Sequence, residues 1–352
     1  MSETIHVRKG AEVDELRLNA FLRDVAGISG PVTVRQFAAG SSNLTYLLTV
    51  GEQEFVLRRP PFGNTVRSAH DMRREFDVLS KLAPYYPPAP RPIVFCEDES
   101  VIGDEFYIME RRTGVVLTFP EEQMRLASLS KTELTEICAG FMRTLAGLHS
   151  LDPKNIGLGE LGEPAGYCRR QVEGWTARYH NSQTHEVVEL ESVIEWLKAN
   201  IPPESGASIV HNDYKFDNVM LDAEDLRRVT TVLDWEMVTV GDPLMDLGTT
   251  LGYWMSADAG EAMLSMPFNP RRLMENVSRA ELAGLYEHFS GRDASQALYY
   301  YVFGSFKIAV IAQQIYARYV RGATRDERFA AFDRSVAALG RIAAAAIDRG
   351  TL

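Results

Sequence analysis

The feature that most constrains the fold is a change in hydrophobic pattern near residue 113. Before that point, short runs alternate apolar and polar residues, as strands buried on one face do. Strands are predicted at 32–37, 44–50, 55–58, 93–96 and 106–109, and a helix is predicted over 67–82. We therefore expect an α+β fold in which a small five-stranded antiparallel sheet with one helix precedes a larger, mostly helical lobe.

The region beyond residue 113 carries clear helix signals. Ser130 and Glu133 have the spacing of a capping box, and apolar residues then recur on one helix face. Two long helices are predicted over 296–320 and 325–347, and a β-rich segment over 209–235 interrupts the helical pattern.

The length favours two parts over one. A chain of 352 residues exceeds what one minimal domain needs. We expect a bilobal arrangement with a cleft between the lobes, formed by residues 1–112 and residues 113–352.

Composition excludes several classes of protein. The chain has 48 acidic against 37 basic side chains, so its net charge is −11, and such a surface repels nucleic acid. Three cysteines without a Cys-x-x-Cys pair indicate neither a disulfide framework nor a zinc site.

A membrane location is not expected either. The apolar stretch 298–312 is interrupted by Ser305 and Lys307 and is shorter than the roughly 20 residues that span a bilayer, so it is predicted to be a buried helix. The polar N-terminus lacks the apolar segment of a signal peptide. We expect a soluble, cytoplasmic protein without nucleic-acid or membrane partners.

A short segment after residue 210 carries the strongest chemical signal, and it reads His211-Asn212-Asp213-Tyr214-Lys215-Phe216-Asp217-Asn218. Its spacing, H-x-D-x-K-x-x-N, is that of the catalytic loop of eukaryotic-type kinases, and Asp234 follows where such enzymes place a metal-binding aspartate. Aspartate and asparagine in hairpins usually serve turns alone, but a chance match at all these positions is rare.

On these residues the chain resembles the aminoglycoside phosphotransferase family, which has the bilobal protein-kinase-like fold. The resemblance runs from about Phe37 to about Trp254 and includes Gly241-Asp242-Pro243-Leu244-Met245-Asp246-Leu247, similar to that family's G-D-P-x-x-D-L. Segments 56–61, 74–76 and 170–175 are most similar to the kinase-like domains of acyl-CoA dehydrogenase family members 10 and 11. The resemblance implies ATP-dependent transfer of a phosphoryl group to the hydroxyl of a small molecule.

The resemblance also implies roles for the motif residues. Asp213 would accept the proton of the substrate hydroxyl or orient it, and Lys215 would place positive charge near the transferring phosphoryl group. Asn218 and Asp234 would supply oxygen ligands to Mg²⁺. His211 is expected to brace the loop by hydrogen bonding.

Residues 1–112 are expected to bind the nucleotide. The turn Gly40-Ser41-Ser42-Asn43 lies where kinases place the loop that covers the phosphates, although it lacks the repeated glycines of G-x-G-x-x-G. Arg58 takes the place of the phosphate-binding lysine, with Arg59 as the alternative, and Glu75 takes that of its helix partner. Glu110 follows the last predicted strand, where the interlobe hinge would offer backbone groups to adenine.

The sequence constrains the identity of the phosphoryl acceptor less than it constrains the catalytic loop. Arg170 and Trp175 are candidates on a helix that the resemblance places beside the cleft, and arginine suits an anionic acceptor. The last predicted helix mixes acidic and basic residues, whereas an aminoglycoside site would need an acidic cluster. We therefore rank a hydroxyacyl-CoA or related metabolite above an aminoglycoside or choline.

Two other functions remain as hypotheses. The chain would be a non-catalytic nucleotide-binding module if the motif had lost its chemistry, but Asp213, Lys215, Asn218 and Asp234 are all present. A protein kinase is disfavoured because Asp-Phe-Gly and Ala-Pro-Glu are absent. The choice between ATP and GTP stays open.

Overall fold

The computed structural model describes all residues except 1–2, 38–42, 62–70, 257–258, 265 and 267. The chain divides into two compact units. Unit 1 comprises Met1–Thr113 together with Thr231–Glu236, and unit 2 comprises Gly114–Thr230 together with Met237–Leu352. Asp234 therefore belongs to unit 1, although the chain on either side of Thr231–Glu236 belongs to unit 2.

Unit 1 is built on a sheet with strand order β1-β2-β3-β4-β6-β5, and neighbouring strands are antiparallel. The strands are β1 (Thr4–Ile5), β2 (Val32–Phe37), β3 (Leu44–Val50), β4 (Gln53–Arg59), β5 (Pro92–Cys96) and β6 (Phe106–Glu110). The alternation in sequence predicts the last five to within two residues. The prediction of five strands is wrong by one, because β1 has only two residues and so carries no period that a pattern can reveal.

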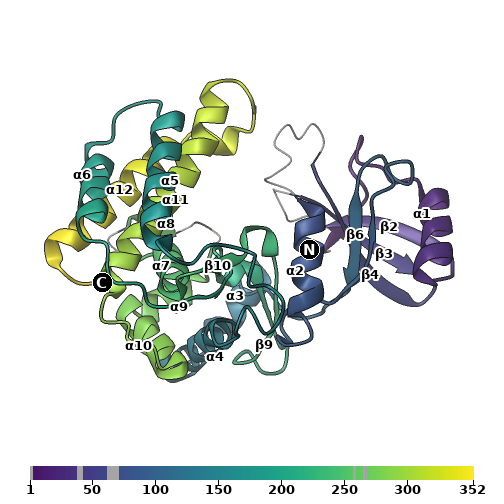
Figure 1. Ribbon diagram of the computed structural model, residues 1–352, viewed down its shortest axis with the longest axis horizontal. Helices are drawn as coiled ribbons and strands as arrows, with labels where there is room; N and C mark the ends of the chain where they lie inside the picture. Colours follow the sequence, from purple (N-terminus) through teal and green to yellow (C-terminus); the bar gives the residue numbers. More distant parts are fainter. Residues whose placement is uncertain (1–2, 38–42, 62–70, 257–258, 265, 267) are drawn as a thin grey trace. The chain divides into compact units, whose positions relative to one another are not determined.

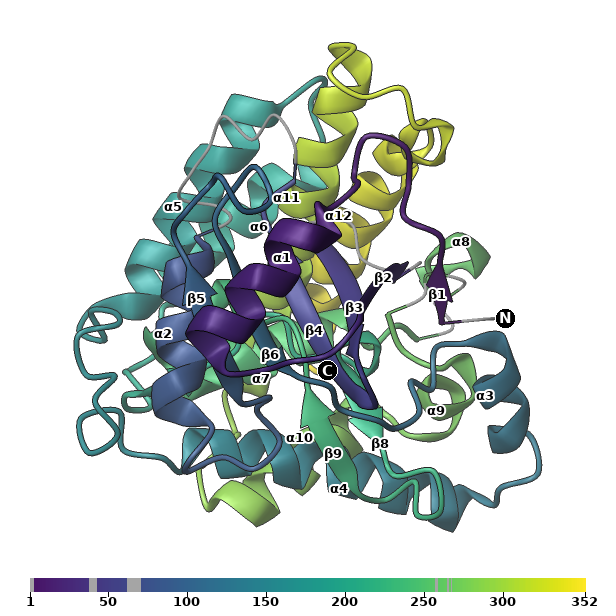
Figure 2. The ribbon, with the colours of Figure 1, turned by 90° about the vertical axis from the view of Figure 1, so that its right-hand side faces the viewer.

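A short helix at the N-terminal end covers one face of this sheet. It is α1 (Glu15–Phe21), which the sequence pattern does not predict, and a π-helical turn (Leu22–Ala26) extends it. Figure 2 shows α1 lying across the strands. Leu18 of α1 is buried in one apolar cluster with Leu48 and Leu57, so this face of the sheet holds the core of unit 1.

The opposite face carries α2 (Met72–Leu82), and the sheet lies between the two helices (Figure 1). Asp71 caps α2 by accepting the backbone N–H of Arg74 over 2.8 Å. The helix is predicted over 67–82, but residues 67–70 lie outside the described part. The ring of Phe76 packs on Tyr107 of β6, with ring centres 6.1 Å apart, and this contact places α2 beside the β4–β6 pair.

Unit 2 is mostly helical, as predicted. Ser130 and Glu133 form the capping box that starts the first long helix, which confirms the prediction. The α-helices of unit 2 are α3 (Pro120–Leu126), α4 (Lys131–His149), α5 (Tyr167–Ser182), α6 (Val188–Ala199), α7 (Pro243–Tyr253), α8 (Glu261–Leu264), α9 (Arg271–Asn276), α10 (Arg279–Ser290), α11 (Ala297–Val320) and α12 (Phe332–Arg349). The longest, α11, packs against α5, α7 and α12 (Figure 1).

The start of α12 differs from the prediction of 325. The side chain of Asp326 accepts the backbone N–H of Arg328 and so starts a single 3₁₀ turn, Glu327–Phe329. The α-helix begins only after that turn, at Phe332.

Four short strands frame the kinase-like motif. They are β7 (Ser208–Val210), β8 (Val219–Leu221), β9 (Val229–Val232) and β10 (Thr239–Gly241), with β7 paired to β10 and β8 paired to β9. The last two residues of β9 belong to unit 1. The sequence predicts this β-rich segment but not β10. The motif residues occupy the connection from β7 to β8.

The apolar stretch 298–312 lies inside α11, most of which is buried. Of the helices in the described part of the chain, none has both the length and the hydropathy needed to cross a bilayer.

Two glycines allow α7 and α11 to approach closely. A Cβ added to Gly304 of α11 would lie 2.0 Å from the carbonyl oxygen of Gly248, and one added to Gly248 would lie 2.2 Å from that of Tyr300. Both distances are far below van der Waals contact, so a methyl group at either position would push the helix backbones apart.

We expect Gly304→Ala to lower the free energy of unfolding by about 1–3 kcal/mol, because overpacking a tight interface strains the backbone. The matched control is Gly284→Ala in α10, where an added Cβ meets nothing within 4 Å and alanine should favour the helix by about 0.5–1 kcal/mol. Urea denaturation followed by circular dichroism measures both. Equal stability of Gly304→Ala and the parent would contradict the packing described.

Candidate active site

The connection after β7 is held by a buried carboxylate of α7. Asp246 accepts the backbone N–H of His211 over 2.6 Å and that of Asn212 over 2.7 Å. The Nε2 atom of His149 donates to the same carboxylate over 3.1 Å. Burial alone would raise the pKa of Asp246, but the hydrogen bond and charge of His149 outweigh it and hold that pKa below its ordinary value. The ionised carboxylate therefore fixes the start of the motif.

Three side chains of unit 2 hold the carboxylate of Asp213. Lys215 Nζ lies 2.5 Å from Oδ2, Asn218 Nδ2 donates to the same oxygen over 2.8 Å, and the Tyr253 hydroxyl donates to Oδ1 over 2.7 Å. The structure thus brings together Asp213, Lys215 and Asn218, as their spacing predicts. Sequence reasoning misses Tyr253, because it lies 40 residues further along, at the end of α7.

This environment favours the ionised form of Asp213. Burial acts to raise the pKa of its carboxyl, but the charge of Lys215 and hydrogen bonds from Lys215 and Tyr253 outweigh burial, so the pKa is lowered. Such a carboxylate is a good hydrogen-bond acceptor and a weak base. It is suited to orienting a hydroxyl group and to taking its proton late, as a loose phosphoryl-transfer transition state requires.

Unit 1 gathers two of the predicted residues, Glu75 and Asp234, around Arg58. The guanidinium nitrogens of Arg58 lie 3.5 Å from the Glu75 carboxylate and 3.4 Å from the Asp234 carboxylate. Arg58 stands opposite Tyr107 in the β4–β6 register, so it shares the sheet face that carries α2. Burial raises the pKa of the Glu75 carboxyl, and the charge of Arg58 offsets part of that rise.

The neighbouring arginine points the other way. Arg59 is 2% exposed and donates to the carbonyl oxygen of Ile102 over 2.8 Å. Because successive residues of a strand face opposite sides of the sheet, only Arg58 meets Glu75 and Asp234. These contacts favour Arg58 over Arg59 as the phosphate-binding arginine, a role that stays a prediction.

Asp234 has an unusual backbone. Its φ is +64°, the left-handed region that aspartate tolerates better than most residues. Its side chain is 30% exposed. Two residues on, Glu236 accepts a hydrogen bond from Asn43 Nδ2 over 3.1 Å, so the segment after β9 is fastened to the start of β3.

The contacts of the other predicted nucleotide-binding residues do not bear on nucleotide binding. Gly40, Ser41 and Ser42 lie outside the described residues. Glu110 accepts the backbone N–H of Arg91 over 2.8 Å and forms an ion pair of 2.7 Å with Arg112. Its carboxylate therefore braces the end of the sheet, and a contact of its backbone with adenine stays a prediction.

The two acceptor-site candidates on α5 face different surroundings. Arg170 is exposed and donates to the backbone carbonyls of Glu163 and Ala165. Trp175 is buried, and its ring lies 5.6 Å from Lys307 Nζ. Lys307 in turn donates a hydrogen bond to Asn212 of the motif. Of the two candidates, Trp175 is therefore the one that lies near the motif. In the sequence, Lys307 stands out as a cation within the apolar stretch 298–312, a feature that by itself argues only against a membrane span.

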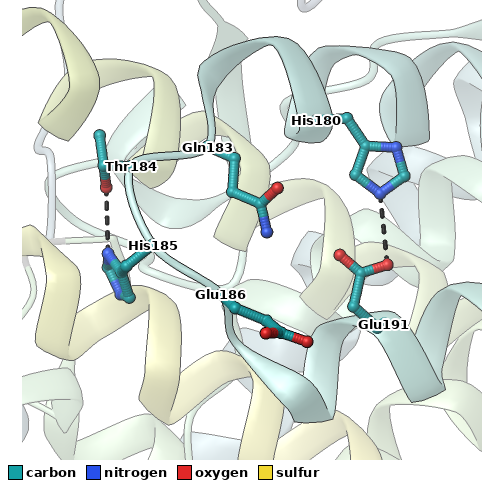
Figure 3. A pocket seen from close by; sticks show the side chains of 6 residues that line it. All are labelled: His180, Gln183, Thr184, His185, Glu186 and Glu191. Carbon is teal, nitrogen blue, oxygen red and sulfur yellow. Dashed lines mark hydrogen bonds and ion pairs between the residues drawn. The ribbon is translucent and has the colours of Figure 1, made fainter.

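A surface hollow of about 470 Å³ lies elsewhere in unit 2, at the turn from α5 to α6 (Figure 3). His180 Nε2 and Glu191 Oε2 are 3.2 Å apart on its wall. The other lining residues are Gln183, Thr184, His185 and Glu186. None of the predicted site residues lines this hollow.

Comparison with known proteins gives consistent results. The family model for the phosphotransferase enzyme family (APH) matches residues 33–273. Acyl-CoA dehydrogenase family member 11 from Gallus gallus is 33% identical over 344 residues, which is 95% of this chain and 43% of that protein. Family member 10 from Mus musculus is 30% identical over 326 residues, which is 90% of this chain and 29% of that protein. The chain thus spans less than half the length of these relatives.

Solved structures point to the same fold. A protein from Ralstonia eutropha JMP134, provisionally assigned as an aminoglycoside phosphotransferase, is 33% identical with a TM-score of 0.80 and covers 96% of this chain and 99% of its own. The aminoglycoside phosphotransferase APH(4)-Ia, solved with ADP and hygromycin B, is 18% identical with a TM-score of 0.58, over 94% and 98% of the two chains. These findings confirm the resemblance and the kinase-like α+β fold predicted from the sequence.

Proposed function

We propose that this chain, which belongs to the phosphotransferase enzyme family, transfers the terminal phosphoryl group of ATP to a hydroxyl group of a small molecule. The observation that carries the proposal is the arrangement around Asp213. A carboxylate kept ionised beside Lys215, Asn218 and Tyr253 is what the acceptor side of phosphoryl transfer requires.

In the proposed reaction the acceptor hydroxyl donates a hydrogen bond to Asp213. Its oxygen forms a bond to the γ-phosphorus as the bond from that phosphorus to the bridging oxygen breaks, and ADP leaves with the electron pair. The hydroxyl proton passes to the Asp213 carboxylate and then to solvent. Lys215 neutralises negative charge that develops during transfer.

Arg58 is the proposed phosphate-binding residue of unit 1. A guanidinium carries several donors in a plane and can bind phosphate oxygens bidentately. Glu75, 2% exposed in its side chain and 3.5 Å away, would orient it. We propose that the turn Gly40–Asn43 covers the phosphates and that the end of β6, at Glu110, contacts the base.

We propose two oxygen-bearing side chains, one in each unit, as magnesium ligands. Asp234 in unit 1 offers a partly exposed carboxylate. Asn218 in unit 2 directs its Nδ2 at Asp213, and no hydrogen bond among the described residues uses its Oδ1. Hard oxygen donors are the ligands Mg²⁺ prefers, so we assign both residues as ligands. When bound, the ion would neutralise charge on the nucleotide phosphates.

We rank a hydroxyacyl-CoA first among acceptors. Two relatives that match nearly the whole chain are named acyl-CoA dehydrogenase family members. In unit 2, Lys307 lies close enough to Lys215 and Arg178 for their charges to act on it. Such a group of cations suits an anionic acceptor and would repel a polycationic aminoglycoside.

A screen of acceptors tests this proposal. ADP release from magnesium-ATP and magnesium-GTP is measured with hydroxyacyl-CoAs, aminoglycosides, a macrolide and choline. We expect turnover with a hydroxyacyl-CoA. Turnover with an aminoglycoside alone would overturn the ranking. If parent and Asp213→Ala were equally inert with every acceptor while ATP raised the melting temperature of both, a non-catalytic nucleotide-binding module would replace the phosphotransferase.

A further inference from the structure

Lys307 is a buried cation in the middle of α11. It is 2% exposed, and its neighbours on the helix, from Phe306 to Ala309, are buried apolar residues. Its Nζ atom donates to the backbone carbonyl of Asn212 over 2.7 Å. This is the only hydrogen bond that Lys307 makes within the described chain.

The charge of Lys307 lies 5.6 Å from the centre of the Trp175 ring. Among the described residues, no carboxylate lies at ion-pair distance, within 4.0 Å of its Nζ atom. Burial lowers the pKa of Lys307 to about 8, against the longer-range attraction of Asp213 and Asp246. A lysine that is charged at neutral pH in such surroundings costs stability. Its presence therefore calls for a role other than holding the fold together.

The contact with Asn212 supplies that role. Asn212 has a φ of +67°, and its carbonyl belongs to the same planar peptide group as the backbone N–H of Asp213. Lys307 binds the oxygen of this peptide group, and the N–H on its other side donates to His211 Nδ1 over 3.3 Å. Asp246 holds the preceding N–H of Asn212. The peptide that leads into Asp213 is thus fixed at both of its polar atoms.

We propose that Lys307 is a positioning residue for phosphoryl transfer, which fixes the Asn212–Asp213 peptide and thereby aims the Asp213 carboxylate at the acceptor hydroxyl. This inference rests on the proposed function. Lys307 does not touch the reacting atoms. Loss of its hydrogen bond leaves the peptide held at its N–H but not at its carbonyl oxygen. A displacement of about 1 Å at a reacting group can lower a rate by about 100-fold.

The test compares Lys307→Met, which has a side chain of similar length without donor or charge, with the parent protein. ADP release from magnesium-ATP is measured with water and with every acceptor of the screen described above. Lys198→Met in α6 is the matched control, because it removes a lysine that is 44% exposed and that, among the described residues, pairs only with Glu195. We expect kcat to fall about 100-fold in Lys307→Met, with KM for magnesium-ATP within twofold of the parent and a melting temperature no lower. Lys198→Met should keep the parent kcat.

Several results would overturn the inference. One is a kcat of Lys307→Met within threefold of the parent. Another is a lower melting temperature together with lower kcat, which would make Lys307 structural. A third is a higher KM for the acceptor at unchanged kcat, which would make it an acceptor-binding residue. If Lys307→Met does not fold, Lys307→Gln is judged by the same criteria.

Asp213→Asn measured alongside separates this inference from the proposed function. A parent no more active than Asp213→Asn would remove the proposed function and the role of Lys307 with it. An active parent that is matched by Lys307→Met would remove only the role of Lys307.

Discussion

Asp213→Asn is expected to lower kcat by about 100- to 10,000-fold, the range that a positioned proton acceptor contributes. The amide keeps the size of the carboxylate and can still bond to Tyr253 and Asn218, so the fold should survive. Because only the transition state uses the proton acceptor, the affinity for magnesium-ATP should change little. Steady-state kinetics with the acceptor found by the screen gives kcat, and calorimetric titration gives nucleotide affinity.

The matched control is Asp217→Asn, four residues further along the same connection. Asp217 is exposed, and its Oδ1 accepts a hydrogen bond from Thr118 over 3.3 Å, which an asparagine can still accept. Its kcat should stay within about twofold of the parent. A kcat of Asp213→Asn equal to that of the parent would contradict the assignment of Asp213.

Asp234→Asn should weaken the binding of magnesium-ATP on the order of 100-fold. The expected loss corresponds to about 2–3 kcal/mol, as for the removal of one charged partner. Asparagine is the informative substitution, because it tolerates the left-handed backbone at this position. Asp234→Ala should weaken binding similarly and also lose about 1–2 kcal/mol of folding stability, since alanine is strained there.

Titration with and without magnesium separates the metal from the nucleotide. If Asp234 is a magnesium ligand, the parent and Asp234→Asn should differ in affinity for ATP with magnesium and converge when the metal is chelated. Asp77→Asn, on the exposed side of α2, is the control that removes one carboxylate from unit 1 without effect. An unchanged affinity of Asp234→Asn for magnesium-ATP would refute the role.

The parts of the structure that the sequence predicts are those with a short-range cause. The alternation over 44–50 predicts β3 without error, and the spacing of Ser130 and Glu133 predicts the start of α4. Spacing also predicts that Asp213 and Lys215 lie side by side, because one connection carries both. The two-residue strand β1 escapes prediction because its only support is a pairing with β2, about 30 residues later.

The rest of the candidate site depends on packing between helices that are far apart in the sequence. Tyr253 and Asp246 reach the motif from α7, and Lys307 reaches it from α11. In sequence, Lys307 is only a cation within an apolar stretch. Its contact with the motif follows from the packing of α7 against α11, which Gly248 and Gly304 allow. This packing brings α11 beside the carbonyl of Asn212.

The return of Thr231–Glu236 to unit 1 affects how the chain must be made. Val232 donates its N–H to the carbonyl of Pro88 over 2.8 Å, and the indole of Trp235 packs on Tyr86. As the chain leaves the ribosome, the first 113 residues appear early, but these partners emerge only after residues 114–230 have been synthesised. Unit 1 therefore stays incomplete until most of the chain exists, and a truncated fragment ending at residue 113 would expose the surface that Trp235 covers.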